Sequence, residues 1–266
     1  MKLTKRLLLA AAAVMTIAAV GTPAMADLKF GVDVSPYPPF TSKNTAGEWE
    51  GWEVDFMNAL CAEIKEKCTF EPTGWDGIIP ALTSKKFDGI LSSMSITPER
   101  EKTISYTNMY YNSAAVLIGP KSDDKDITPE HLSGKTIGVQ GATTHANYLD
   151  KYFKPKGAEI KSYAGQDEAN ADLAAGRVDY VMADGVTLGA FLASDEGKAC
   201  CEQKGAVPTD VEVLGKGVGI GTRKEDTAFR EKLNAAIKTL ADKGFFEENT
   251  KKWKLDGKLI LPKDLK

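Results

Sequence analysis

The sequence has few of the residues that metal sites and acid–base catalysts use. Its 266 residues include two histidines, His131 and His145, and four cysteines, and none of these has the spacing of a zinc site. No phosphate-binding loop and no paired nucleophile and base can be recognised. The sequence therefore predicts no metal and no cofactor, and it favours a binding protein over an enzyme.

Long apolar runs are also scarce, and the one prominent run lies near the N-terminus. A basic start precedes an apolar segment at 7–20, and Ala24-Met25-Ala26 has the small-x-small pattern of a cleavage site. The segment is shorter than the roughly 20 residues that span a bilayer. Residues 1–26 are therefore predicted to be a secretory signal peptide, cleaved after Ala26, that leaves a soluble exported chain.

An excess of basic residues is absent as well. Removing Lys2, Lys5 and Arg6 with the signal peptide leaves 31 of the 34 basic residues, against 37 acidic ones. A mildly acidic surface argues against nucleic acid and anionic membranes as partners. The 240 residues that remain of 266 after the first 26 are enough for two domains that each bury a core.

The four cysteines favour disulfides, because an exported chain with an even cysteine count usually pairs them. Cys61 lies on the apolar face of a predicted helix, and Cys68 begins the strand that follows, so a bridge between helix and strand is feasible. Cys200 and Cys201 are adjacent. The sequence leaves open whether they form a vicinal disulfide or stay free.

A hydroxyl-rich stretch, 92–100, follows a predicted strand at 87–91. Its serines lead into a helix start, with Thr97 as N-cap and Pro98 at the first helical position. Hydroxyls and free amides at a helix start suit a small anion such as a carboxylate.

Arg100 falls in the first turn of that helix, where a cation opposes the helix macrodipole. A basic residue in the first turn departs from the usual preference for acidic residues there, and such a departure at an otherwise regular helix start often marks a functional site. A guanidinium there can bind a carboxylate through two parallel hydrogen bonds. The alternative is that Arg100 pairs with Glu99 or Glu101 on a solvated face.

A short pattern recurs within the chain. The segment 82–88 matches 173–179, which lies 91 residues later, and this predicts two lobes with the same βαβ plan. The offset places Ser93 and Asp184 just beyond the carboxyl ends of buried strands, where open α/β sheets bind ligands. A cation from one lobe and a carboxylate from the other suit a zwitterion. Alternatively, Asp184 caps a helix at 185–193.

Several other residues each have two interpretations. Tyr37 and Phe40 lie in a proline-rich loop and form either a pocket wall or loop packing. Thr143 either helps to bind an anion or simply caps the next helix. Glu53 either favours a cationic ligand or is an ordinary acid at a helix start. His145 is either a general base or an exposed helix residue.

The strands that cross between the lobes set the expected boundaries. The first lobe is predicted at 27–112 and 214–266, and the second at 113–213. Hinge strands are predicted near 114–118 and 211–221, where alternate glycines permit unusual backbone angles.

Taken together, the motifs resemble one family. They are Asp76-Gly77-Ile78-Ile79-Pro80-Ala81-Leu82, Lys85-Lys86-Phe87-Asp88, the stretch 92–100, and the second-half segments 138–144 and 172–179. In these motifs, and over essentially the whole mature length, the chain resembles the periplasmic solute-binding proteins of ABC importers, in the polar amino-acid-binding family. It is similar to the lysine/arginine/ornithine-, histidine- and opine-binding members.

The resemblance implies a fold class and a biological setting. The fold would be α/β, two-lobed and of type II, with a mixed sheet flanked by helices in each lobe and the ligand in the cleft. The protein would be a periplasmic monomer that captures an amino acid, cationic or an opine derived from one. Hinge closure would then present it to the membrane subunits of an ABC permease. Cys61 and Cys68 match the disulfide of the cationic amino-acid binders.

The resemblance also assigns roles to the ends of the ligand. Arg100 would hold the α-carboxylate, helped by Ser95 and the Thr143 backbone. Ser93 and Asp184 would receive the α-ammonium group.

The remaining assignments concern the ligand side chain. Trp75 and Tyr37 would sandwich it, and Glu53 would reach its far end in a cationic ligand. Met94, with Trp75, would also accept a neutral polar side chain. The second-lobe loop adds two further ligand-binding residues, Gln140 and Thr144.

Two departures from the family pattern bear on the ligand. The loop after Asp33 is one residue longer than in the histidine binder, so whether Asp33 or Glu53 reaches the ligand side chain stays open. The segment 197–208 has no counterpart in the family. Two other functions remain as alternatives: a cyclic-acid dehydratase on the same fold, for which His145 is the one plausible histidine, and a ligand-sensing subunit of a receptor.

Overall fold

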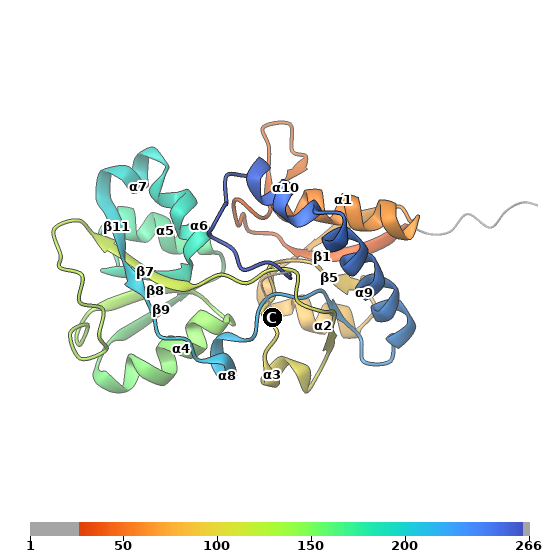
Figure 1. Ribbon diagram of the computed structural model, residues 1–266. Coiled ribbons are helices and arrows are strands. Elements are labelled where there is room, and N and C mark those ends of the chain that lie inside the picture. Colours follow the sequence, from red (N-terminus) through yellow and green to blue (C-terminus); the bar gives the residue numbers. More distant parts are fainter. Residues whose placement is uncertain (1–26, 263–266) are drawn as a thin grey trace, which may run out of the picture.

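The computed structural model describes residues 27–262, so the predicted signal peptide at 1–26 lies outside the described residues. Two five-stranded sheets, each flanked by helices, form two lobes that lie side by side (Figure 1). We call the lobe built around strand β1 the first lobe and the lobe built around strand β8 the second lobe. Within 27–262, no helix has both the length and the apolar character needed to cross a membrane.

The first lobe has the strand order β4-β1-β5-β12-β6. Its strands are β1 (Leu28–Asp33), β4 (Cys68–Thr73), β5 (Gly89–Ile90), β6 (Ser105–Tyr106) and β12 (Gly221–Thr222). Its helices are α1 (Trp52–Ile64), α2 (Ile78–Thr83), α3 (Pro98–Glu101), α9 (Thr227–Asp242) and α10 (Phe245–Lys252), with a 3₁₀ turn η1 (Trp75–Gly77). A small hairpin of β2 (Ser42–Lys43) and β3 (Trp49–Glu50) precedes α1.

The second lobe has the strand order β11-β7-β10-β8-β9. Its strands are β7 (Ala115–Pro120), β8 (Thr136–Gln140), β9 (Glu159–Tyr163), β10 (Tyr180–Asp184) and β11 (Cys201–Ala206). Its helices are α4 (Thr144–Tyr152), α5 (Gln166–Ala174), α6 (Gly185–Leu192) and α7 (Asp195–Cys200), with a 3₁₀ turn η2 (Lys154–Lys156). A short helix, α8 (Val211–Leu214), follows β11.

The two sheets follow one plan, as the internal repeat predicts. In the first lobe, β1 lies parallel between β4 and β5, and β12 lies antiparallel between β5 and β6. In the second lobe, β8 lies parallel between β9 and β10, and β7 lies antiparallel between β10 and β11. The matching segments 82–88 and 173–179 lie just before β5 and β10, which are therefore equivalent strands.

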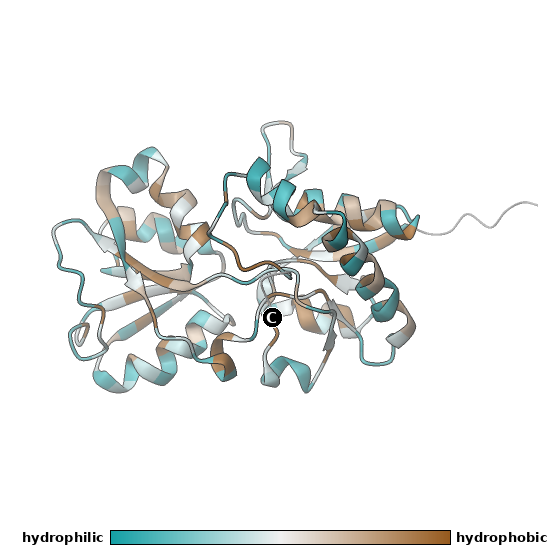
Figure 2. Cartoon of the chain, viewed as in Figure 1, coloured by the Kyte–Doolittle hydropathy of each residue, from teal (hydrophilic) through white to brown (hydrophobic). Residues whose placement is uncertain are grey.

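The cores of the two lobes differ in composition. Figure 2 shows hydrophobic colour along the buried strands and hydrophilic colour on the outer helices. The first-lobe core is rich in aromatic rings: Trp52 stacks on Tyr110 with centroids 6.1 Å apart, and Phe40 stacks on Tyr111 at 4.7 Å. The second-lobe core is mainly aliphatic, and its buried members include Leu117, Ile137, Val139, Leu149 and Met182.

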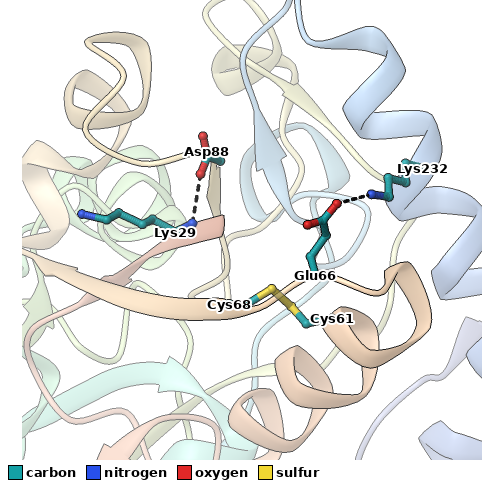
Figure 3. Close-up of a disulfide and its surroundings, with 6 residues drawn as sticks. All are labelled: Lys29, Cys61, Glu66, Cys68, Asp88 and Lys232. Atoms are coloured by element: carbon teal, nitrogen blue, oxygen red, sulfur yellow. Dashed lines mark hydrogen bonds and ion pairs between the residues drawn. A yellow bond between two sulfur atoms is a disulfide. The ribbon is translucent and has the colours of Figure 1, made fainter. Parts of the chain in front are cut away.

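Both cysteine pairs form disulfides. Cys61 on α1 is joined to Cys68 at the start of β4, with Cα atoms 6.1 Å apart, so the predicted bridge from helix to strand is confirmed (Figure 3). Glu66, in the turn between them, also pairs with Lys232 on α9 at 2.7 Å. The choice left open for the other pair is resolved, because Cys200 and Cys201 form a vicinal disulfide where α7 meets β11.

Two segments, 107–114 and 207–220, carry the chain between the sheets, and they lie side by side (Figure 1). The Val218 amide donates to the Tyr111 carbonyl at 2.8 Å, and the Tyr110 amide donates to the Val218 carbonyl at 2.9 Å. The strand expected at 211–221 is wrong at its start, where α8 forms instead. Asp210 caps this helix, since its Oδ1 accepts from the Glu212 amide at 3.0 Å.

Candidate functional site

A cavity lies between the two lobes. The first lobe lines it with Asp33, Tyr37, Trp75, Ser92, Ser93, Ser95 and Arg100, and the second lobe with Gln140, Thr143, Thr144, His145 and Asp184. Strands β1, β8 and β10 end at this cavity, because their last residues are Asp33, Gln140 and Asp184. The cavity thus has the position that α/β sheets favour for ligands, outside the carboxyl ends of their strands.

Arg100 points into the cavity rather than onto the solvated face of α3. Thr97 caps α3 as predicted, accepting from the Arg100 amide at 3.2 Å. The Arg100 guanidinium donates to the Ser95 carbonyl at 3.0 Å and to the Ala142 carbonyl of the second lobe at 3.4 Å. It also lies over the Trp75 ring, 5.4 Å from the centroid.

The acids beside Arg100 have other partners. Glu99 pairs with Lys102, and Glu101 pairs with Lys216 at 3.3 Å. Among residues 27–262, no carboxylate lies within ion-pair distance of the Arg100 guanidinium. Burial lowers the pKa of Arg100 from its usual value, so this cation is held in a desolvated place and its partners are neutral groups. The alternative of an exposed surface pair is therefore wrong.

Asp184 supplies the opposite charge from the second lobe. It stands at the N-cap position of α6, but its carboxylate makes no capping bond, so the alternative of a plain cap is wrong. Its Oδ2 accepts from the Tyr37 hydroxyl at 2.7 Å, and its Oδ1 accepts from the Ser113 hydroxyl at 2.6 Å. Both partners are neutral, which leaves the negative charge available to a ligand cation.

His145 contradicts the expectation of an exposed helix residue. It lies in the first turn of α4 on the cavity wall, and it is 8% exposed. Its Nε2 lies 3.8 Å from Asp184 Oδ1. Burial lowers the pKa of His145, so the imidazole is neutral at pH 7 and does not neutralise Asp184.

The second-lobe loop 140–144 meets the first lobe through its backbone. Thr143 caps α4, since its hydroxyl accepts from the Ala146 amide at 3.1 Å. The same hydroxyl donates to the Gln140 carbonyl at 2.7 Å, which leaves the loop backbone as the group that Thr143 can offer to a ligand. Trp75 Nε1 donates across the cleft to the Ala142 carbonyl at 3.0 Å.

Asp33 is a second acid on the cavity wall. Its Oδ1 accepts from the Ser35 amide at 3.2 Å, and its Oδ2 accepts from the Gln140 side chain of the opposite lobe at 2.6 Å. The Asp33 amide donates to the Ser92 hydroxyl at 2.9 Å, so these two wall residues hold each other. Burial raises the pKa of Asp33.

Two predicted site residues do not line the cavity. Glu53 is fully buried behind Ser93, and it accepts hydrogen bonds from the Ser93 amide at 2.8 Å and the Ser93 hydroxyl at 3.0 Å. Met94 is 1% exposed and packs in the first-lobe core with Ile78 and Leu82. Both depart from the expected contact with a ligand side chain.

The other predicted residues lie together on the cavity wall: Tyr37, Trp75, Ser93, Ser95, Arg100, Gln140, Thr143, Thr144 and Asp184. The sequence leaves Asp33 open, includes Ser92 only as one of the hydroxyls of the stretch 92–100, and offers His145 only as the general base of an enzyme. For Ser92, the signal was present in the serine-rich stretch itself. Neither of the other two has a local pattern that shows which way its side chain points.

Comparisons with known proteins agree with this geometry. The family of bacterial extracellular solute-binding proteins, family 3, matches residues 28–256. The chain is 40% identical over 222 residues to the L-arginine-binding protein of Pseudomonas aeruginosa, which covers 83% of this chain and 85% of that protein. It is 39% identical over 230 residues to the histidine-binding periplasmic protein of Escherichia coli K12, covering 85% and 87%.

A solved structure extends the comparison to three dimensions. An ancestral arginine-binding protein bound to arginine is similar to this chain with a TM-score of 0.79 and 30% identity, over 85% of this chain and 97% of that one. The two-lobed α/β fold is thus confirmed. These relatives are binding proteins by name, which supports the prediction of a binding protein rather than an enzyme.

Proposed function

Because this chain belongs to the bacterial extracellular solute-binding proteins of family 3, we propose that it captures an α-amino acid between its lobes for uptake by an ABC importer. One observation carries the proposal. Arg100 and Asp184 lie on opposite walls of one cavity, carry opposite charges and have only neutral partners. A zwitterion satisfies both charges at once and therefore favours the closed arrangement of the lobes.

The side chain of the ligand is proposed to be cationic. After Arg100 and Asp184 have bound the α-carboxylate and the α-ammonium, the cavity still contains the carboxylate of Asp33. A guanidinium or ammonium group there would offset the cost of burying this acid. The aromatic rings of Tyr37 and Trp75 would contact the apolar part of such a side chain. Arginine fits best, with lysine, ornithine, histidine and arginine-derived opines in the same class.

The setting of the protein follows from two further points. The predicted signal peptide at 1–26 and the periplasmic name of a relative support a periplasmic location. We propose that the chain acts as a monomer and that the closed lobes are the form that the permease subunits bind. No partner other than the amino acid and the permease is proposed.

Thermal unfolding against a ligand panel tests the function. The mature protein is first refolded to remove bound ligand and then mixed with arginine, lysine, ornithine, histidine, octopine, glutamine or a cyclic acid. A ligand at 100 times its Kd stabilises the fold by about 2.7 kcal/mol, which raises Tm by about 5–11 °C at this size. Shifts with the cationic members support the proposal. No shift with any amino acid overturns it, and turnover of the cyclic acid would show an enzyme.

A pair of variants tests the side-chain assignment. Asp33→Asn should weaken arginine binding at least about tenfold, because a buried charged partner is lost, and leave glutamine binding within about twofold. Asp76→Asn is the matched control, since Asp76 is exposed and does not line the cavity. Equal losses of affinity for arginine and glutamine in Asp33→Asn would show that Asp33 supports the cavity wall but does not bind the side chain of the ligand.

A further inference from the structure

Glu53 lies immediately behind the cavity wall, separated from the ligand space by Ser93. It is the second residue of α1, next to the fully buried Trp52, and is itself 0% exposed. Its Oε1 accepts from the Ser93 amide at 2.8 Å and its Oε2 from the Ser93 hydroxyl at 3.0 Å. The Tyr110 hydroxyl donates to Oε1 as well. A buried carboxylate with three donors and no ligand contact has a supporting task.

Ser93 needs such support, because its backbone is in the left-handed region. Its φ is +51°, a conformation that costs a residue with a Cβ about 1–2 kcal/mol. The two hydrogen bonds that Ser93 donates to Glu53 hold both the amide and the side chain of Ser93 in this conformation. The donor and acceptor roles within the pair also matter. Because the single hydroxyl hydrogen of Ser93 is given to Glu53, only oxygen lone pairs remain to face the cavity.

We propose that Glu53 is a positioning residue that makes the Ser93 hydroxyl an obligate acceptor for the α-ammonium group of the ligand. This inference rests on the proposed function, since it concerns the same site. It replaces the expected role of Glu53 at the far end of the ligand. On this view Glu53 acts through Ser93 on the recognition of the amine that all α-amino acids share, whatever their side chain.

The electrostatics of the site agree with this role. Burial raises the pKa of Glu53 to about 7, against the bonds from Tyr110 and Ser93, which lower it, and Asp184 raises it further. The titratable groups that face Glu53 are Tyr110, Tyr111 and Asp184, and none of them is a cation. A ligand ammonium at Ser93 would therefore favour the ionised carboxylate, and binding near pH 7 would release a proton. A protonated Glu53 could donate to Ser93 and turn its hydroxyl hydrogen toward the ligand.

The first test compares two ligands that differ only in the α-amine. Dissociation constants are measured by calorimetry at pH 8 for arginine and for 5-guanidinopentanoic acid, which lacks the amine. Glu53→Gln should weaken arginine about tenfold, the cost of one charge-assisted hydrogen bond, and change the analogue less than twofold. Glu63→Gln on the same helix, whose carboxylate pairs with Lys243 outside the cavity, is the control and should change neither. Equal losses for the two ligands in Glu53→Gln would overturn the inference.

The second test measures protons. Calorimetry of arginine binding at pH 7 in buffers of different ionisation enthalpy should show release of about half a proton in the wild type and none in Glu53→Gln. Equal release in both proteins would contradict the assignment. If Glu53→Gln does not fold, Ser93→Ala serves instead: it should lose arginine affinity selectively over the analogue, and full retention would overturn the inference. A wild type that binds no amino acid would overturn the proposed function itself, which is a separate result.

Discussion

In the first lobe, the cavity wall stands on the end of β1, which has six residues, and on the short elements β5, of two residues, and α3, of four. In the second lobe it stands on β8 and β10, of five residues each, and on α4, of nine. The same sheet plan thus presents its binding groups in two ways. The second lobe uses the ends of regular elements, whereas the first lobe uses one regular strand end, at Asp33, and a stretch of irregular backbone held in place by buried polar side chains such as Glu53 and Thr97. Equivalent topology therefore does not imply equivalent sensitivity to change.

The aromatic residues divide in the same way. The four tryptophans of the chain, Trp49, Trp52, Trp75 and Trp253, belong to the first lobe. Tryptophan fluorescence consequently follows the first lobe, whereas far-ultraviolet circular dichroism follows both. Measured together, the two signals allow the unfolding of the first lobe to be compared with that of the whole chain.

The largest expected effect is at the first-lobe cation. Arg100→Ala should reduce arginine affinity at least about 100-fold, because the ligand carboxylate would be buried without a charged partner. Calorimetry measures the loss, and the Tm of the unliganded protein should stay within a few degrees. Arg177→Ala is the control, since Arg177 is exposed and pairs with Asp172 away from the cavity. Near-normal affinity in Arg100→Ala would show that the first lobe does not bind the α-carboxylate of the ligand.

The second-lobe anion should matter somewhat less. Asp184→Asn keeps the size of the side chain and a group that can accept from Tyr37, but it loses the charge that faces the α-ammonium. We expect a loss of about 10–100-fold in arginine affinity, measured by the same titration, with Asp195→Asn on the exposed start of α7 as the control. A loss greater than that of Arg100→Ala would reverse the ranking of the two lobes.

The disulfides offer a comparison in stability. The Cys61–Cys68 bridge closes a loop seven residues long, so replacing both cysteines by alanine should lower the free energy of unfolding by about 2 kcal/mol. The Cys200–Cys201 bridge joins neighbours and closes almost no loop, so the corresponding double variant should change it by less than about 1 kcal/mol. Urea unfolding followed by both optical signals tests this. A larger loss in the Cys200/Cys201 variant would show that the vicinal bridge shapes the folded second lobe.

The smallest effect concerns pH and the buried support of the first-lobe wall. Because the folded pKa of Glu53 is raised to about 7, the folded state binds a proton that the unfolded state has released. This bound proton stabilises the folded state at low pH. The stabilisation is lost as the pH rises from about 5 to 7, which lowers the free energy of unfolding by roughly 1–2 kcal/mol. The difference in unfolding free energy between wild type and Glu53→Gln, without ligand, should shift by this amount in favour of the variant. A constant difference across this range would mean that Glu53 does not titrate there.

Much of this architecture could be predicted from the sequence. The recurrence of 82–88 at 173–179 indicates two equivalent lobes, and strand ends followed by Arg100 and Asp184 indicate the two charges of the cavity. Helix α4 begins directly after Thr143, where the predicted cap places its start. Helix α8 was missed although Asp210 is a good N-cap, because the glycines after it favoured an extended crossing.

The directions of individual side chains were harder to predict. Glu53 and Asp33 are both acids near the first-lobe wall, and no local pattern shows that one faces the cavity while the other faces Ser93, 40 residues away. His145 would be exposed on an isolated α4, but in the folded chain it lies on the cavity wall and is buried. These outcomes depend on long-range packing, which short sequence patterns do not record.

The paired crossing segments have a mechanical consequence. Two lobes joined by two adjacent chain segments can rotate readily about the line that runs across both segments. Sliding or twisting of one lobe against the other would instead strain the segments themselves. The hydrogen bonds between Tyr110, Tyr111 and Val218 keep the two crossing segments together, so they act as one hinge rather than as two independent linkers. Opening should therefore swing each wall of the cavity along a single arc. The binding groups on one wall would keep their positions relative to one another during this motion, so each open lobe would present a preformed half of the site.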